Sequence, residues 1–171
     1  RKLGFHAASA GGPLKDDEYV VTSDIGCYTL GVYPPLAALD TCACMGASIG
    51  QAHGLEKAGV ANRIVSVIGD STFIHSGITS LVDIVYNEGR GTVIILDNNT
   101  TAMTGHQGHP GTGISARGES ARRVVVEDLC RGVGVGDVNV IDAFDLPVIE
   151  ATIKRCVATD EPAVIVVRGG C

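Results

Sequence analysis

Short apolar runs alternate along the chain with longer stretches in which apolar residues recur at helical spacing. The two clearest runs span residues 64–68 and 92–96 and are rich in β-branched residues, which predicts two buried parallel strands. Between them, residues 73–87 carry apolar side chains three and four positions apart, the spacing of one face of a helix. The unit is therefore strand, helix, strand, and we expect the carboxyl ends of both strands at one edge of the sheet.

The rest of the chain repeats this alternation. Further strands are predicted at 19–23, 139–141 and 163–167, and further helices at 45–59, 119–131 and 146–158. The glycine-rich run 132–136 follows a helix instead of opening one, so it predicts a turn and not a dinucleotide-binding fingerprint. Residues 1–18 are weakly patterned and indicate a helix end and a loop. The alternation predicts an α/β fold of three layers, α/β/α, with a mostly parallel central sheet.

Composition and charge narrow the class of protein. The 171 residues are 45% hydrophobic, with 23 glycines and no tryptophan, which favours a compact domain with tight turns and argues against disorder. We expect a single domain over residues 1–171, and the start at Arg1 and the stop directly after a strand lead us to expect a piece of a longer polypeptide. The net charge of -6 gives no reason to expect nucleic acid as a partner. No apolar run could span a membrane and no secretory signal pattern is present, so we expect no membrane partner and a cytoplasmic protein.

Polar segments follow both strands of the central unit. Gly69-Asp70-Ser71 follows the first strand, and Asp97-Asn98-Asn99-Thr100 follows the second. A carboxylate at Asp70, an amide oxygen at Asn98 and a backbone carbonyl just beyond are ligands that Mg²⁺ takes, with phosphate oxygens completing the octahedron. The first amides of the helix after Asp70 would also favour a phosphate. Ordinary capping of strand and helix ends explains the same residue types, so this pattern by itself leaves both interpretations open.

Several separated segments resemble a known enzyme family. The Gly-Asp pair followed by Asn98 resembles the diphosphate-binding motif of thiamine-diphosphate enzymes. More narrowly, six segments resemble the α subunit of indolepyruvate ferredoxin oxidoreductase, a 2-oxoacid:ferredoxin oxidoreductase, in order and spacing. They are Asp24-Ile25-Gly26-Cys27-Tyr28-Thr29-Leu30-Gly31, Cys44-Met45-Gly46-Ala47-Ser48-Ile49-Gly50, Gly69-Asp70-Ser71-Thr72-Phe73-Ile74-His75-Ser76-Gly77-Ile78, Leu96-Asp97-Asn98, Thr101-Ala102-Met103-Thr104-Gly105-His106-Gln107 and His109-Pro110-Gly111-Thr112-Gly113. The resemblance covers residues 20–171 and implies the thiamine-diphosphate-binding fold.

The resemblance implies a site for thiamine diphosphate and Mg²⁺. The metal would be held by the Asp70 carboxylate, the Asn98 side chain and the Thr100 carbonyl. The segment that starts at Met45 would line the diphosphate and the thiazolium ring, although its small residues also serve tight packing of a helix on the sheet. The cofactor-binding residues implied in this way are Gly26, Cys27, Met45, Gly46, Gly69, Asp70, Ser71, Asn98, Thr100, Met103, Thr104 and Gly105.

Three histidines are candidates for a role beside the substrate. Residues 98–117 form a long polar stretch, and such loops in compact domains are usually functional or mobile. His106 and His109 lie on it, and His75 lies one turn into the helix after Asp70. Each is either solvated or near enough to a 2-oxoacid to hold its carboxylate or to move a proton. We take His75 and His106 as candidate catalytic residues.

The resemblance also gives two cysteines a candidate role. In related ferredoxin oxidoreductases, cysteines at the positions of Cys27 and Cys171 join a Cys-x-x-Cys pair as ligands of a proximal [4Fe-4S] cluster. This chain has no such pair, and Asp24 replaces the first glycine of the segment around Cys27. The resemblance thus implies [4Fe-4S] clusters in the complete enzyme, with Cys27 and Cys171 as candidate ligands. Cys130 and Cys156 lie inside helical patterns and are interpreted as core residues.

The activity that the resemblance implies is oxidative decarboxylation of an aryl pyruvate such as indolepyruvate to an acyl-CoA, with electrons passing to ferredoxin. The implied partners are a pyrimidine-binding domain of the same full-length subunit, a β subunit, ferredoxin, the 2-oxoacid and coenzyme A. In thiamine enzymes a glutamate that activates the cofactor's pyrimidine comes from the pyrimidine-binding domain. We therefore expect the isolated chain to be inactive or nearly so.

Two other functions stay open. One is a subunit of a non-redox thiamine-diphosphate 2-oxoacid decarboxylase, which would have Gly-Asp-Gly where this chain has Gly69-Asp70-Ser71. The other is a metal- and diphosphate-binding module without turnover. The choice of 2-oxoacid rests on the resemblance alone, because the substrate pocket would be shared with parts outside this sequence.

Overall fold

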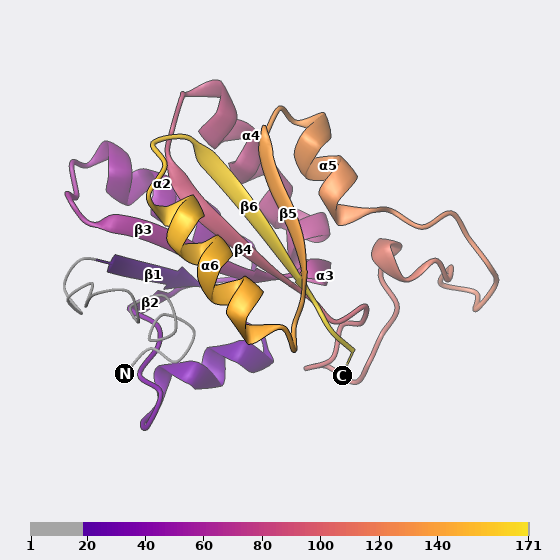
Figure 1. Cartoon of the computed structure of the whole chain (residues 1–171). Coiled ribbons are helices and arrows are strands. Elements are labelled where there is room, and N and C mark those ends of the chain that lie inside the picture. Colours follow the sequence, from indigo (N-terminus) through magenta and orange to yellow (C-terminus); the bar gives the residue numbers. More distant parts are fainter. Residues whose placement is uncertain (1–18, 171) are drawn as a thin grey trace.

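A six-stranded parallel sheet forms the centre of the molecule in the computed structural model, which describes residues 19–170 (Figure 1). The strand order is β2-β1-β3-β4-β6-β5, and every neighbouring pair is parallel. The strands are β1 (Tyr19–Ser23), β2 (Thr41–Cys42), β3 (Arg63–Gly69), β4 (Gly91–Asp97), β5 (Asp137–Asp142) and β6 (Pro162–Arg168). The predicted α/β class with a parallel sheet is confirmed. The expectations for residues 1–18 and for Cys171 lie outside the described residues.

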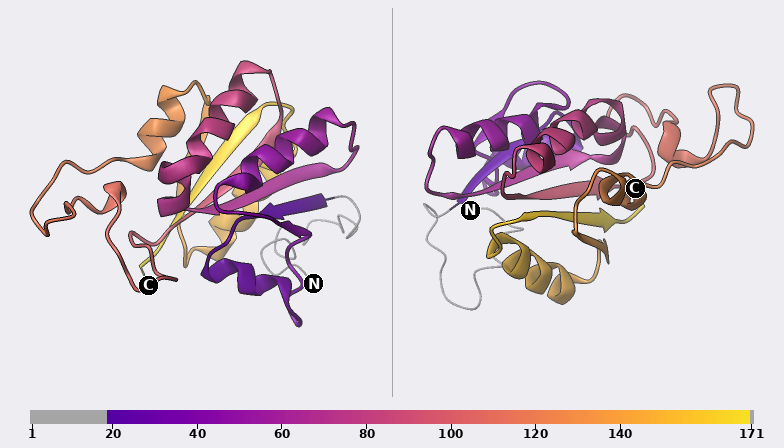
Figure 2. Two further views of the ribbon diagram at one scale, coloured as in Figure 1. Left: turned by 180° about the vertical axis from the view of Figure 1, so that it is seen from behind. Right: turned by 90° about the horizontal axis from the view of Figure 1, so that it is seen from above.

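Helices cover both faces of this sheet. The longer helices are α2 (Ala47–Lys57), α4 (Ile78–Tyr86), α5 (Val126–Gly132) and α6 (Leu146–Val157). Two views in Figure 2 show α2 and α4 on one face and α6 on the opposite face, so the predicted three-layer arrangement is confirmed. Within residues 19–170, no helix is long and apolar enough to cross a lipid bilayer.

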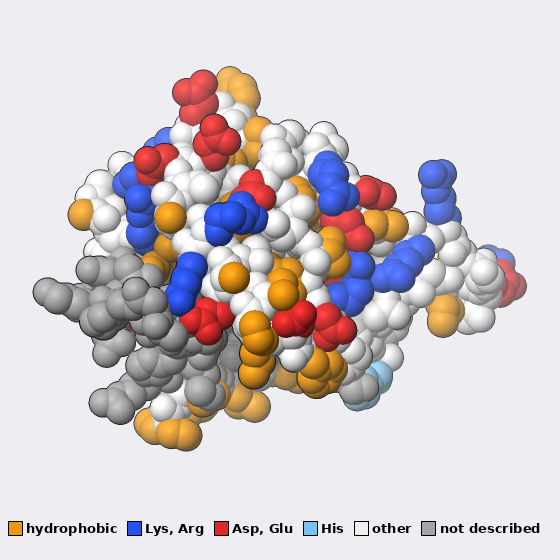
Figure 3. All heavy atoms as spheres, viewed as in Figure 1, with side chains coloured by type: hydrophobic (Ala, Val, Ile, Leu, Met, Phe, Trp, Pro, Cys, Tyr) orange, Lys and Arg blue, Asp and Glu red, His pale blue; other side chains and the backbone are white. Residues whose placement is uncertain are grey.

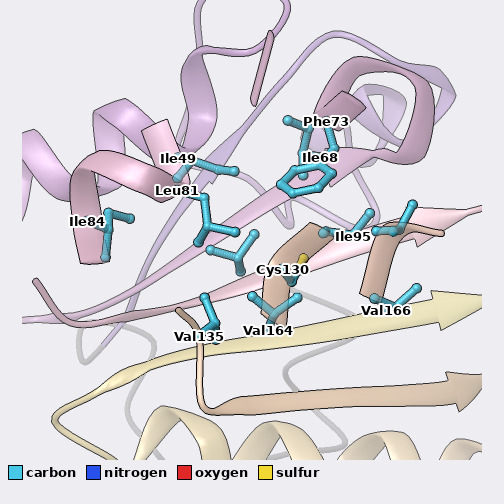
Figure 4. Packing of buried hydrophobic residues seen from close by; sticks show 12 residues of the cluster. Ile49, Ile68, Phe73, Leu81, Ile84, Ile95, Cys130, Val135, Val164 and Val166 are labelled. Atoms are coloured by element: carbon cyan, nitrogen blue, oxygen red, sulfur yellow. The ribbon is translucent and has the colours of Figure 1, made fainter. Parts of the chain in front are cut away.

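The larger cluster of buried hydrophobic side chains lies between the sheet and the helices α2, α4 and α5. Figure 4 shows Ile49, Leu81 and Cys130, one from each helix, meeting Ile68 and Val164 of the sheet. All five side chains are fully buried. Burying an aliphatic side chain of this size contributes about 1.5–3 kcal/mol. The full burial of Cys130 confirms this cysteine as a core residue, and burial also raises the pKa of its thiol to about 12.

The second cluster lies under α6. Ile153 and Cys156 of this helix pack against Val65 of β3 and Ile165 of β6. Burial raises the pKa of the Cys156 thiol to about 11, so the prediction that this cysteine is a core residue is confirmed as well. With a packed cluster on each face, the sheet is held as a rigid platform whose carboxyl edge carries the loops.

Two helices start three or more residues from the predicted position. The helix predicted at 73–87 begins earlier, because α3 (Asp70–Thr72), the π-helical turn η2 (Phe73–Gly77) and α4 follow one another without a break. The helix predicted at 119–131 is wrong in its first half, since α5 starts only at Val126. The preceding segment bonds to the loop instead, with Ala121 N–H donating to Gly113 O and Val124 N–H to Pro110 O. These tertiary backbone bonds replace the bonds that a helix would make.

Residues 98–125 leave the carboxyl edge of the sheet as one long excursion, which contains the short 3₁₀ turn η3 (Pro110–Thr112). Figure 1 shows it projecting to one side of the sheet before it returns to α5. Isolated bridges join Thr101 to Gln107 and Ile114 to Ser120. Basic side chains stand out on this projection in Figure 3, and its exposed arginines are Arg117, Arg122 and Arg123. The predicted polar loop is thus present and is longer than expected.

Besides η3, two elements of the described residues were not predicted. The 3₁₀ helix η1 (Cys27–Val32) follows β1 at the carboxyl edge of the sheet. The two-residue strand β2 pairs only with β1, through Thr22 and Ser23. Both are too short for hydrophobic periodicity to reveal them.

Candidate functional site

A cavity of about 340 Å³ opens at the carboxyl edge of the sheet. It is bounded by the segments that follow β1, β3 and β4, because the carboxyl ends of neighbouring parallel strands meet there. The cavity brings together ten predicted cofactor-binding residues, namely Gly26, Cys27, Met45, Gly69, Asp70, Ser71, Asn98, Thr100, Met103 and Thr104. Gly46 and Gly105, which were also predicted, do not line it.

Asp70 is buried at the start of α3, directly after β3. Its Oδ1 accepts a hydrogen bond from the N–H of Ser71 at 2.7 Å, and its Oδ2 accepts one from the N–H of Asn99 at 2.9 Å. Burial raises the pKa of Asp70, but contact with His109 and the Ser71 N–H outweigh burial and hold the pKa below its usual value. The carboxyl group is therefore ionised at neutral pH and joins the two strand ends.

His109 is buried at the N-terminal end of η3. Its Nδ1 accepts a hydrogen bond from the N–H of Gly111 at 3.2 Å, which in the neutral ring assigns the proton to Nε2. That Nε2 lies 3.2 Å from Asp70 Oδ2 but is not well directed at it, so we treat the pair as an electrostatic contact. Among the described residues, His109 Nε2 and Ser66 Oγ are the buried side-chain atoms without a well-directed partner. His109 therefore contacts Asp70 from the loop side and does not itself line the 340 Å³ cavity.

The segment after β4 forms the opposite wall. Asn98 Oδ1 accepts a hydrogen bond from the N–H of Thr100 at 3.3 Å, and both residues line the cavity. The hydroxyl of Thr101 donates to Ser71 Oγ at 2.8 Å and ties this segment to α3. Asp70, Asn98 and Thr100, whose oxygens are the predicted cation ligands, therefore line one cavity.

This donor set fits one kind of cation. Within the part of the chain that the structure describes, no three His, Cys, Asp or Glu side chains are grouped so as to hold a metal. The predicted set has a single carboxylate, Asp70, beside two neutral oxygens. Mg²⁺ is commonly bound through one or two carboxylates, waters and the phosphates of a ligand. The residues present thus fit Mg²⁺ that arrives with a diphosphate, and do not fit a metal held by protein alone.

Tyr28 is a cavity residue that the sequence interpretation missed. Its hydroxyl oxygen accepts a hydrogen bond from the N–H of Gly69 at 2.9 Å, and burial raises the pKa of this hydroxyl. A side chain at Gly26 would overlap the Tyr28 ring. The ring therefore fixes the end of β3 and explains why glycine stands at position 26.

Asp24, which replaces a glycine of the related segment, is an internal capping residue. It is fully buried, and its Oδ1 accepts from the N–H groups of Ala47 and Ser48 at 2.8 and 3.1 Å. Burial raises the pKa of Asp24. Gly46 has φ of 91°, and a side chain there would overlap the Ser76 hydroxyl. Of the two interpretations of this small-residue segment, packing of α2 accounts for Gly46.

The two candidate catalytic histidines lie outside this cavity. His75 is exposed in η2, with its Nδ1 3.0 Å from Ser76 Oγ. His106 is exposed and lines a larger hollow of about 870 Å³ along the excursion. The two hollows share Thr100, so His106 lies across the loop from the cavity. Their catalytic role stays a prediction.

The described cysteines form no cluster. Cys27 is exposed and lines the cavity, while Cys42 and Cys44 are exposed elsewhere. Cys171, the other candidate ligand, lies outside the described residues. A [4Fe-4S] cluster with these ligands stays a prediction for the complete enzyme.

The chain matches one protein family and is similar in sequence to several known proteins. The family described as "Thiamine pyrophosphate enzyme, C-terminal TPP binding domain" matches residues 24–167. The chain is 46% identical over 149 residues to the indolepyruvate oxidoreductase subunit IorA of Archaeoglobus fulgidus, covering 87% of this chain and 24% of that protein. It is 40% identical to IorA of Thermococcus kodakarensis, covering 100% of this chain and 28% of that protein. The chain thus spans about a quarter of the length of the curated relatives it matches. The resemblance inferred from the motifs is confirmed.

Solved structures share the fold. A 2-oxoglutarate:ferredoxin oxidoreductase from Magnetococcus marinus, solved with 2-oxoglutarate, coenzyme A and succinyl-CoA bound, superposes with a TM-score of 0.87 at 16% identity. The match covers 98% of this chain and 60% of that chain. Benzoylformate decarboxylase from Polynucleobacter necessarius gives a TM-score of 0.65 at 13% identity, over 98% of this chain and 32% of that one. At these identities the likeness concerns the fold alone.

Proposed function

Because the chain belongs to the thiamine pyrophosphate enzymes, as their C-terminal TPP-binding domain, we propose that the 340 Å³ cavity holds the diphosphate end of thiamine diphosphate through Mg²⁺. The observation that carries the proposal is the convergence of Asp70, Asn98 and Thr100 on that cavity from two neighbouring strands. In this proposal the buried, ionised carboxylate and the two neutral oxygens hold the cation, and the diphosphate supplies the remaining ligands.

Each group has a defined task in this proposal. Asp70 gives the cation its one protein charge and is held in place by the N–H groups of Ser71 and Asn99. Asn98 and Thr100 add neutral oxygens, so that the charge of Mg²⁺ remains available for the diphosphate. The first amides of α3 lie beside the same carboxylate and favour an anion. When bound, thiamine diphosphate supplies the nucleophilic carbon and the electron sink for decarboxylation of a 2-oxoacid.

We further propose that the chain is one diphosphate-binding domain within a longer 2-oxoacid:ferredoxin oxidoreductase. The name of the relatives supports indolepyruvate as the substrate class. Coenzyme A and ferredoxin as further reactants follow from the motif resemblance. Met45 and Met103 line the cavity, yet their side chains are 46% and 48% exposed. Leu30 and Tyr33, which follow Cys27 closely in the sequence, are exposed as well. Such an apolar surround fits a second domain that covers the cofactor, the pyrimidine-binding domain.

Calorimetric titration of thiamine diphosphate into the chain, with and without Mg²⁺, tests the binding proposal. We expect binding that requires Mg²⁺ and that is lost in Asp70→Ala. The matched control is Asp160→Ala, which removes an exposed aspartate paired with Arg63 at the other end of the sheet. If Asp70→Ala binds as tightly as the unaltered chain, or if the chain and a longer polypeptide containing it both fail to bind, the proposed site is wrong.

A further inference from the structure

Arg168 ends β6 directly beside the last residue of β4, and its guanidinium connects two acidic residues. Its Nε donates to Asp97 Oδ2 at 2.7 Å. Its Nη atoms donate to the Glu127 carboxylate of α5, at 3.3 and 2.8 Å. Asp97 and Arg168 are paired neighbours in the parallel ladder, so the register of β4 and β6 sets this contact. Sequence reasoning assigned no role to any of the three residues.

Asp97 connects this arginine to the cofactor cavity. It is 4% exposed, and its second oxygen, Oδ1, accepts from the N–H of Asn99 at 3.2 Å. The same N–H donates to Asp70 Oδ2. Two buried carboxylates therefore share one donor. Without a counter-charge they would repel each other, and Arg168 supplies that charge on the side of Asp97 that faces away from Asn99.

The shared donor belongs to a residue in an unusual conformation. Asn99 has φ of 60°, in the left-handed region that most residues other than glycine avoid. The two carboxylates hold its N–H and thereby keep the turn in this conformation. Asn98 and Thr100 flank the turn, so the directions of the Asn98 side chain and of the Thr100 carbonyl depend on it.

We propose that Arg168 is a positioning residue of the diphosphate site, which acts through Asp97 to hold the turn at Asn99. It orients the neutral oxygens on either side of that turn toward the cation while making no contact with the cation itself. The consequence for cofactor binding rests on the function proposed above, whereas the hold on Asn99 does not. Groups that orient metal ligands from the second layer typically change metal affinity about 10–100-fold when they are removed.

The test compares Arg168→Gln with Arg155→Gln in the same chain. Arg155 makes a similar fork, to Asp137, at the far edge of the sheet, so its loss reports ion-pair removal away from the cavity. The first readout is amide hydrogen exchange at Asn99 without cofactor. The second is the Mg²⁺ concentration that gives half-maximal binding of thiamine diphosphate.

For Arg168→Gln we expect faster exchange at Asn99 and a half-saturating Mg²⁺ concentration raised about tenfold. For Arg155→Gln we expect neither change. Arg168→Lys keeps the charge but loses the fork, so it should fall between Arg168→Gln and the unaltered chain. If Arg168→Gln fails to fold by circular dichroism, Arg168→Lys is compared in its place.

Unchanged exchange at Asn99 and unchanged Mg²⁺ dependence in a folded Arg168 variant would overturn the inference. Equal effects in the Arg168 and Arg155 variants would do the same, because they would mark a general loss of stability. If the unaltered chain binds no cofactor, the proposed function fails on its own, and the exchange comparison still decides whether Arg168 holds the turn.

Discussion

Nε2 of His109 lies 3.2 Å from Oδ2 of Asp70, although one residue sits in the projecting loop and the other at the end of a central strand. The contact brings the imidazole ring to a buried carboxylate that accepts hydrogen bonds from the N–H groups of Ser71 and Asn99. It accounts for part of the lowered pKa of Asp70 in spite of its burial. The long loop is therefore attached to the very residue on which the proposed cation site depends.

Replacing His109 tests this attachment. In His109→Phe the ring volume remains but the donor is gone, so burial dominates and we expect the pKa of Asp70 to rise. Binding of Mg²⁺ and thiamine diphosphate should weaken at acidic pH first, since the carboxyl group must be ionised to bind the cation. The pKa is measured by NMR titration of the Asp70 carboxyl carbon. His109→Gln, which keeps a donor, should recover part of the shift. An unmoved pKa in both variants would show that the contact is without electrostatic effect.

The Glu127–Arg168 pair predicts a pH dependence of stability. Its hydrogen bond with Arg168 lowers the pKa of Glu127 in the folded chain below the ordinary 4.5. The stabilisation is therefore fully present above the unfolded-state pKa and is lost as pH falls through the lower, folded-state pKa. At pH 7 we expect Glu127→Gln to reduce the free energy of unfolding by about 1 kcal/mol, since the pair is partly exposed.

Urea unfolding of the unaltered chain and of Glu127→Gln, repeated from pH 7 down to pH 3, measures this difference. The difference in free energy of unfolding between the unaltered chain and Glu127→Gln should become smaller below about pH 4.5, where protonation removes the charge of Glu127. A gap that stays constant over the whole range would mean that packing, and not charge, carries the contribution of this residue.

Two glycines predict opposite effects of the same substitution. Gly26→Ala would push a methyl group into the Tyr28 ring, so we expect a loss of about 1–3 kcal/mol from the free energy of unfolding. Gly54→Ala lies inside α2 with no atom in the way, so we expect a gain of about 0.5–1 kcal/mol from the better helix former. Thermal unfolding of both variants and of the unaltered chain measures these changes in stability. If Gly26→Ala left the free energy of unfolding unchanged, this would argue against a tight contact between position 26 and the Tyr28 ring.

Cysteine labelling reports on the cavity. Cys27, Cys42 and Cys44 are exposed, whereas Cys130 and Cys156 are buried with raised thiol pKa values. Among these five described cysteines, the first three should therefore react rapidly with iodoacetamide and the last two should not. Thiamine diphosphate with Mg²⁺ should slow labelling of Cys27, which lines the cavity. Peptide mass spectrometry measures each site, and Cys42 and Cys44 serve as internal controls. Equal rates at Cys27 with and without cofactor would place the cofactor elsewhere.

Much of the fold follows from short-range pattern. The β-branched runs predicted β3 and β4 because a strand buried on both faces needs an uninterrupted apolar segment. The start of α5 at Val126 could not be predicted in this way. There the backbone of Ala121 and Val124 bonds to loop residues, and no local preference records such a partner. The type of an element could therefore be predicted where burial imposes a hydrophobic period on the sequence. The boundary of an element could not be predicted where tertiary hydrogen bonds compete with those of the helix.

The amino-acid sequence by itself determined which side chains stand at the strand ends. Asp70 and Asn98 had to lie at the same edge, because neighbouring parallel strands end at one edge of a sheet. The tertiary structure alone decided what surrounds them. His109 reaches Asp70 from a loop, Tyr28 supports Gly69 from another strand end, and Arg168 reaches Asp97 from the last strand. These contacts join residues far apart in the chain, and their existence depends on register, loop path and packing, which are properties of the folded molecule as a whole.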